Sequence, residues 1–132
     1  MSGEQDLQKM LAGLRPKLMD GTYVFASFAI ADYEQVIAKR PLATFREEEG
    51  LTALLSVEDA SALGVADLSA WKGITLQIHS SLSAVGLTHA ISGVLTEHGI
   101  PANVIAAYYH DHVFVPEDKA QAAIAALVTL MK

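Results

Sequence analysis

The chain has 132 residues, of which 52% are hydrophobic and 18% charged, which provides enough apolar material for a packed core and argues against disorder. Its formal net charge is −6, and its nine lysines and arginines form no run or stripe, which argues against nucleic-acid binding. The chain contains no cysteine, and this excludes disulfides, thiolate zinc sites and cysteine nucleophiles.

The sequence predicts a soluble, cytoplasmic protein. Residues 1–14 lack the apolar core of a secretion signal. The longest apolar stretch, residues 120–131, is interrupted by polar side chains and is shorter than the ~20 residues that a membrane-spanning helix needs. We therefore expect no membrane span.

The first half of the chain is predicted to hold a helix, a buried strand, a hairpin and a second, short helix. Apolar residues at helical spacing indicate an amphipathic helix over 4–15, and the β-branched and aromatic residues of 22–30 indicate a strand buried on both faces. Residues 42–46 and 51–56 alternate around an acidic turn with a glycine, which is typical of a hairpin. A capping-box pattern at Ser56 then opens the short helix.

Residues 72–132 follow the order β-α-β-β-α of a ferredoxin-like unit. The predicted elements are a strand at 74–79, a helix at 87–98, strands at 102–109 and 112–115, and a helix after Pro116. A final edge strand is missing after Lys132, and such an edge has to be covered. We predict that strand 22–30 covers it. The expected fold is α+β, with two ferredoxin-like lobes at 1–68 and 69–132, each with an antiparallel sheet and helices on one face.

Three stretches of the second half resemble the ACT domain family. They are Ser83-Ala84-Val85-Gly86-Leu87, Glu97-His98-Gly99-Ile100-Pro101, and Asp111-His112-Val113-Phe114-Val115-Pro116. The chain is similar in particular to small tandem ACT-domain proteins of bacteria and to the ACT lobes of the CASTOR arginine sensors, with a weaker match over 21–60. The resemblance implies regulation by a small ligand, usually an amino acid held between lobes of paired subunits.

The predicted helix start at Leu87 is a candidate binding site. A helix start offers unpaired N–H groups and the positive end of the helix dipole, which suit a carboxylate. Gly86 allows a ligand to approach the backbone closely. The alternative is that Ser83 caps the helix while Gly86 only permits tight packing between helix and sheet.

Asp111 is the second candidate, at a predicted turn between two strands. Its carboxylate could pair with a ligand ammonium or guanidinium, as the resemblance to the arginine sensors implies, or it could only stabilise its own turn. A helix start and a carboxylate together match the charges of an α-amino acid. We therefore place the ligand at the boundary of a lobe or subunit, against the residues Ser81, Ser83, Val85, Gly86, Leu87, Ala107, Tyr109 and Asp111.

Histidines and serines give weaker indications of metal or catalytic chemistry. His110 and His112 project on the same face of a strand and could share a metal, but no third ligand is spaced to complete the site. The chain has no Gly-x-Ser-x-Gly elbow, and no nucleophile, base and orienting partner are spaced to act together. An enzyme is therefore the least favoured class, and no cofactor or metal is expected.

The sequence as a whole predicts a regulatory protein that binds a small molecule, with an amino acid as the suspected ligand. The alternative is an adaptor that uses the same fold without a ligand, either as a structural element or to bind a protein partner. Small lobes bury little surface on their own, and ACT-like lobes typically meet side by side. We therefore expect a homodimer.

Overall fold

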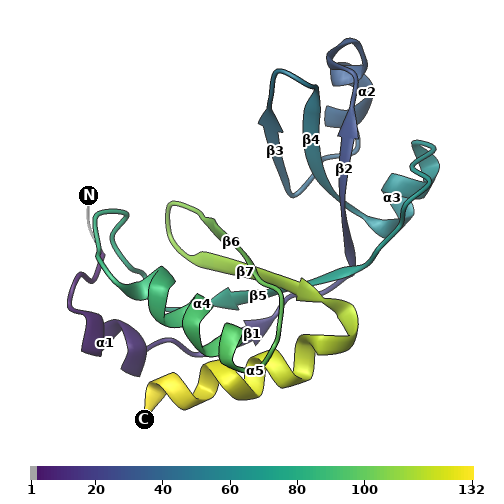
Figure 1. Ribbon diagram of the computed structural model, residues 1–132. Helices are drawn as coiled ribbons and strands as arrows, with labels where there is room; N and C mark the ends of the chain where they lie inside the picture. The colour runs from purple at the N-terminus through teal and green to yellow at the C-terminus, as the bar shows by residue number, and fades with distance from the viewer. Residues whose placement is uncertain (1–2) are drawn as a thin grey trace. The chain divides into compact units, whose positions relative to one another are not determined.

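The computed structural model describes residues 3–132 and divides them into two compact units, whose elements are labelled in Figure 1. The terminal unit combines the residues up to Asp20 with Lys72–Lys132, and the central unit is Gly21–Trp71. Each unit combines helices with antiparallel strand pairs, which confirms the predicted α+β class. Within the described residues, no helix is both long and apolar enough to span a membrane.

The sheet of the terminal unit has the strand order β1-β5-β7-β6. Its strands are β1 (Pro16–Leu18), β5 (Trp71–Leu76), β6 (Asn103–Ala106) and β7 (Asp111–Pro116). Its helices are α1 (Leu7–Ala12), α4 (Leu87–Glu97) and α5 (Ala120–Val128), and Figure 1 shows α4 and α5 running along the sheet. In chain order from β5 this is the predicted β-α-β-β-α series, with β1 in the place of the missing last strand.

The strand that completes this sheet comes from the N-terminal segment. β1 pairs antiparallel with β5, and the pairing continues through hydrogen bonds from Gln77 N–H to Leu14 C=O and from Met19 N–H to Gly73 C=O, both 2.8 Å. β1 therefore covers β5 over Ile74–Leu76, and β2, within the predicted strand 22–30, meets β5 only where Tyr23 pairs with Trp71. The sequence gives little sign of β1, because three residues that begin with a proline carry no clear alternation.

The central unit is built in the same order. Its strands β2 (Tyr23–Phe28), β3 (Ala43–Arg46) and β4 (Leu51–Ser56) pair antiparallel in the order β3-β4-β2. A 3-10 turn at Ile30–Asp32 and helix α2 (Tyr33–Ile37) join β2 to β3, and helix α3 (Val57–Ala62) follows β4. Ser56 accepts a hydrogen bond from the Asp59 N–H at 3.1 Å, so the predicted cap is confirmed. Helix α2 was not predicted.

The division into units differs from the predicted lobes 1–68 and 69–132 in one respect. The N-terminal segment lies with the second lobe, because β1 hydrogen-bonds to β5 and the side chains of Met10 and Leu14 are fully buried in the core of the terminal unit. The change of unit near residue 71 lies close to the predicted boundary.

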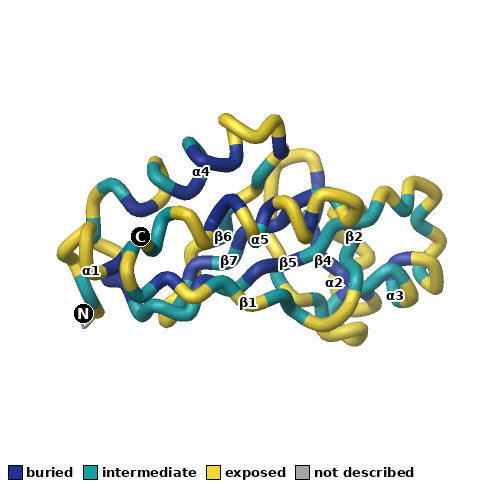
Figure 2. Tube along the Cα trace, turned by 90° about the horizontal axis from the view of Figure 1, so that it is seen from below, coloured by how far each residue is buried: buried dark blue, intermediate teal, exposed yellow. Residues whose placement is uncertain are grey.

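Each unit has a hydrophobic core of its own, whose buried positions are dark blue in Figure 2. In the terminal unit, apolar side chains of the helices pack on the inward-facing residues of β5 and β7. Examples are Ile91 of α4 and Leu127 of α5 on the helices, and Ile74 of β5 and Val113 of β7 on the strands. In the central unit the core consists of Val24, Ala26, Val36, Leu51, Ala53, Leu55 and Ala60. The predicted apolar faces of α4, α5 and β5 are therefore buried, whereas β2, predicted to be buried on both faces, buries Val24 and Ala26 and leaves Phe25 37% exposed.

Candidate functional site

A small cavity of about 70 Å³ lies in the terminal unit where α4 begins. The loop after β5, the first turn of α4, the end of β6 and the start of β7 provide its walls. Three residues proposed from the sequence line it, namely Ser81, Leu87 and Asp111. Five others that line it were not predicted, namely Ser80, Leu82, Ala84, Thr88 and Ala106.

Asp111 provides a buried carboxylate in this cavity. It is the first residue of β7, it pairs in register with Ala106, and its side chain is only 8% exposed. The hydroxyl of Ser80 donates to Asp111 Oδ2 at 3.3 Å. A buried carboxylate has about four acceptor sites, so one hydroxyl leaves most of its hydrogen-bonding capacity for another partner.

The first turn of α4 lies at the same cavity. Gly86 precedes the helix with φ 101° and ψ −18°, and no side chain caps the helix start. Leu87 and Thr88, the first two helical residues, line the cavity. Because the first N–H groups of a helix have no partner within it, this end of α4 can bind a negatively charged group.

Gly86 also has the packing role given as the alternative, although its partner is a helix and not the sheet. Its positive φ favours glycine, and a Cβ at this position would lie 3.2 Å from Leu7 Cδ2 of α1. Both observations restrict residue 86 to a small side chain independently of any ligand.

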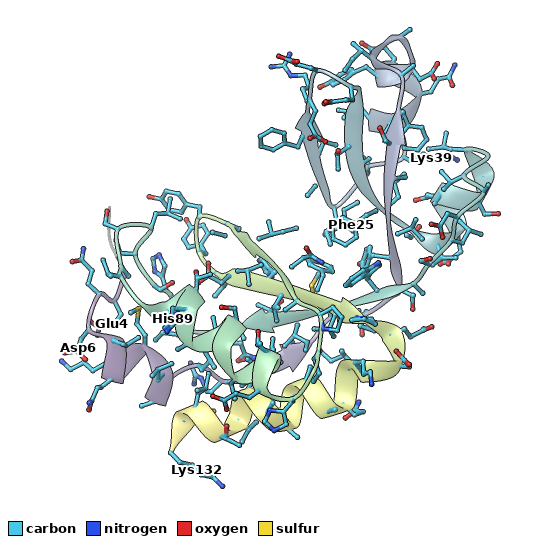
Figure 3. All side chains as sticks on the ribbon, viewed as in Figure 1. Glu4, Asp6, Phe25, Lys39, His89 and Lys132 are labelled. Atoms are coloured by element: carbon cyan, nitrogen blue, oxygen red, sulfur yellow. The ribbon has the colours of Figure 1, made fainter. Side chains whose placement is uncertain are left out.

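The N-terminal segment fixes the loop that carries the cavity. Glu4, labelled in Figure 3, donates its N–H to the His79 carbonyl at 2.8 Å and accepts from the Ser81 N–H at 2.9 Å. The Ser81 hydroxyl accepts from the Ser83 N–H at 3.1 Å and from Gln5 Nε2 at 3.4 Å. Ser83 therefore helps to shape the loop, and no side-chain hydrogen bond caps α4. This support was not visible in the sequence.

The remaining predicted residues lie outside the cavity wall. Val85 is 83% exposed and Tyr109 is 62% exposed, and the Tyr109 ring packs beside His79 with 5.4 Å between ring centroids. Ala107 is exposed in the turn before β7, where its N–H donates to the His110 carbonyl at 3.0 Å. The predicted residues thus form two groups, one inside the cavity and one on the surface.

The two neighbouring histidines lie on the same side of the chain, as predicted, with ring centroids 6.4 Å apart. His112 Nδ1 lies 3.0 Å from the Thr75 hydroxyl oxygen. Burial and the positive charge of His110 lower the pKa of His112 below its usual value, although Asp111 opposes the shift. Within residues 3–132, no set of three potential metal ligands converges around them or elsewhere.

The size of the cavity limits what it can hold. Its volume of about 70 Å³ corresponds to roughly two water molecules at ~30 Å³ each, whereas ligand pockets measure ~300–1,000 Å³. The cavity can therefore accept the charged groups of a small ligand but cannot enclose a larger one.

Comparisons with known proteins agree on the family. Two models described as ACT domain match in tandem, over residues 2–72 and 71–129. A solved structure from Vibrio cholerae, of unknown function and described as a possible transport protein, is 49% identical, with 92% of each chain covered and a TM-score of 0.81.

More distant structures share the fold. The ligand-free regulatory subunit of aspartate kinase from Thermus thermophilus is 11% identical, with 91% of this chain and 99% of that chain covered and a TM-score of 0.66. A protein from Agrobacterium tumefaciens is 14% identical, with 88% and 87% covered and a TM-score of 0.64. The curated proteins include no match.

Proposed function

Because this chain belongs to the ACT domain family, we propose that it is a regulatory module that binds a small molecule, and that the ligand is an α-amino acid. One observation carries the proposal. The buried carboxylate of Asp111 and the uncapped first turn of α4 line the same cavity. An α-amino acid carries one group for each of them.

In this binding mode the ligand carboxylate accepts hydrogen bonds from the N–H groups at the start of α4. The ligand ammonium pairs with Asp111, and Ser80 holds that carboxylate in place through its hydroxyl. The cavity is too small to enclose a side chain, so specificity for one amino acid has to come from groups outside it. The role proposed is regulatory and non-catalytic, and its cytoplasmic location stays a prediction.

A homodimer is the second part of the proposal. Leu82, Val85 and Tyr109 expose 56%, 83% and 62% of their surfaces beside the cavity, and burying them against a second copy would complete the binding site. We expect light scattering to give a mass near twice the 14.1 kDa of the chain. A mass near 14.1 kDa at micromolar concentration would contradict this part.

Thermal shift against the twenty amino acids tests the ligand. A specific ligand raises stability by RT ln(1 + [L]/Kd), which is about 2.7 kcal/mol at 100 Kd. The variant Asp111→Asn keeps the shape of the side chain but removes its charge, so we expect binding to weaken by about 10-fold to 100-fold. Asp118→Asn, at an exposed carboxylate of the same unit, is the matched control and should bind normally.

A ligand-free adaptor is the second candidate, and the small volume of the cavity favours it. If it is correct, none of the twenty amino acids shifts the melting temperature. If an amino acid binds but Asp111→Asn binds it as tightly as Asp118→Asn does, the ligand lies elsewhere and the proposed site is wrong.

A further inference from the structure

A second, larger cavity of about 610 Å³ lies against β1 and β5 of the terminal unit. Arg15, Lys17, Thr75, Gln77 and His110 contribute to its lining, and all of its lining residues belong to the terminal unit. It shares no lining residue with the cavity beside α4.

Strand alternation explains why these side chains gather on one face. Lys17 pairs in register with Thr75, while their neighbours Leu18 and Ile74 pack into the hydrophobic core under the helices. Since successive residues of a strand point to opposite faces, Lys17 and Thr75 point away from the helices. His112 joins them from β7 through its 3.0 Å contact with the Thr75 hydroxyl.

The cavity concentrates positive charge on an acidic protein. Arg15 and Lys17 are both exposed, and neither forms an ion pair with another residue in the range 3–132. Asp20 is the one acidic residue that lines the cavity, so the lining has two positive side chains, Arg15 and Lys17, and one negative side chain. The whole chain, by contrast, has a net charge of −6. A small anion near this chain therefore finds a local excess of positive charge here.

The backbone at Arg15 is a further indication. Arg15 has φ 42°, in the left-handed region where glycine is favoured and other residues are strained. It lies where the chain turns from α1 into β1, and it lines the cavity. Arg40 has a similar φ of 55° and also precedes a proline, but it does not line this cavity. Arg40 therefore provides a matched control.

We propose that this face binds a small organic anion through a carboxylate or phosphate group. The guanidinium of Arg15 can bind such a group with two parallel hydrogen bonds, and Lys17 adds a second positive charge. Thr75 and Gln77 can hydrogen-bond the rest of the molecule, and Met19 offers it apolar surface. The volume of about 610 Å³ is within the range of metabolite pockets, ~300–1,000 Å³. This site is independent of the amino-acid site proposed beside α4.

The test is an NMR titration of the full-length, ¹⁵N-labelled chain at low ionic strength, with inorganic phosphate in one series and succinate in the other. We expect saturable shifts of the amides of Arg15, Lys17, Thr75 and Gln77, with the amides of the cavity beside α4 unmoved. Tighter binding of succinate would assign a carboxylate ligand, and tighter binding of phosphate would assign a phosphorylated one.

Two pairs of variants make the result specific. Arg15→Gly removes the guanidinium while relieving the positive φ, so its fold should be preserved and its anion affinity should fall at least about tenfold. Arg40→Gly relieves a similar φ in the central unit and should bind as the unchanged chain does. Lys17→Gln should weaken binding, and Lys119→Gln should not. The proposal would be overturned if neither anion gave saturable shifts. It would also be overturned if Arg15→Gly and Arg40→Gly bound the anion with equal affinity.

Discussion

The two units place different residues at the start of equivalent strands. β4 of the central unit reads Leu-Thr-Ala-Leu-Leu-Ser and β7 of the terminal unit reads Asp-His-Val-Phe-Val-Pro, yet both show the same sequence of buried and half-buried positions. The first position is buried in each, and it is Leu51 in one unit and Asp111 in the other. The fold therefore requires a buried side chain at this position but not a charged one. The presence of a carboxylate at Asp111 is not explained by the fold alone.

The helices that start beside these strands differ in the same sense. Neither α4 nor α2 has a side-chain cap, but α4 has eleven residues and begins after Gly86, whereas α2 has five and follows a 3-10 turn that contains Asp32. A helix start preceded by an acidic residue is poorly suited to a second carboxylate. Only the terminal unit thus combines an open helix start with a buried acid, which is why the ligand site is proposed there.

The largest expected effect tests whether burial of a charge is special to Asp111. Val113 lies two residues along β7, points to the same core and is fully buried opposite Val104. Val113→Asp should lower the free energy of unfolding by about 3–5 kcal/mol, because an unpaired charge is buried. Asp111→Leu, which copies the central unit, should cost less than about 2 kcal/mol, since only the Ser80 hydrogen bond is lost. Urea denaturation measures both, and equal costs would give Asp111 a structural role.

An intermediate effect tests the face of the sheet without helices. In the central unit, Tyr23 comes directly before Val24, the first residue of β2 that faces the core. In the terminal unit, Gly73 comes directly before Ile74, the first residue of β5 that faces the core, so glycine stands where the central unit has tyrosine. A Cβ at Gly73 would lie 2.5 Å from Met19 Sδ and 2.8 Å from the Phe114 ring. Gly73→Ala should therefore destabilise the protein by about 1–3 kcal/mol through overpacking.

Gly93 is the control for this change, because a Cβ there meets nothing within 4 Å and the residue lies inside α4. Gly93→Ala should raise stability by up to about 1 kcal/mol, since alanine is the better helix former. Thermal unfolding of the two variants should give shifts of opposite sign. If Gly73→Ala left the melting temperature unchanged, Met19 and Phe114 would not be packed against Gly73 as described.

The smallest expected effect is a pH dependence of stability that comes from His112 of the terminal unit, where the central unit has Thr52. Burial and the charge of His110 lower the pKa of His112 in the folded state, so folding disfavours its protonated form. The contribution of neutral His112 to stability should therefore be fully present above its pKa in the unfolded chain, about 6.5. The free energy of unfolding should then fall as the pH drops below that value. Melting temperatures at pH 7.5 and 5.5 should differ less for His112→Thr than for the unchanged chain. An equal difference would remove His112 as the cause.

Sequence patterns predicted most of the fold because they report local periodicity. The strands and helices after residue 72 and the hairpin of the central unit follow from alternation, helical spacing and turn residues. β1 was missed because its role depends on pairing with β5, more than fifty residues away in the chain. α2 was missed because its five residues are too short for a periodic pattern and only Val36 is buried.

The candidate site was predictable only where residue type alone carried the information. Asp111 and Leu87 were found because an acid at a turn and a helix start both have a recognisable chemistry, and because both lie in stretches that resemble the ACT domain family. Ser80 was missed, since a serine among serines carries no signal until the structure pairs it with Asp111. Tyr109 and Val85 were included because apolar residues near a site suggest a wall, yet the turn and the loop leave them exposed.

The most direct test of the difference between the two units is an NMR titration of the full-length, ¹⁵N-labelled chain with pooled amino acids. We expect shifts in the amides of Ser81, Leu87, Thr88 and Asp111, with the amide of Leu51 and its neighbours in the central unit unmoved. In Asp111→Asn the same shifts should need about 10-fold to 100-fold more ligand. Shifts centred on the start of β4, or shifts that persist unchanged in Asp111→Asn, would contradict this expectation.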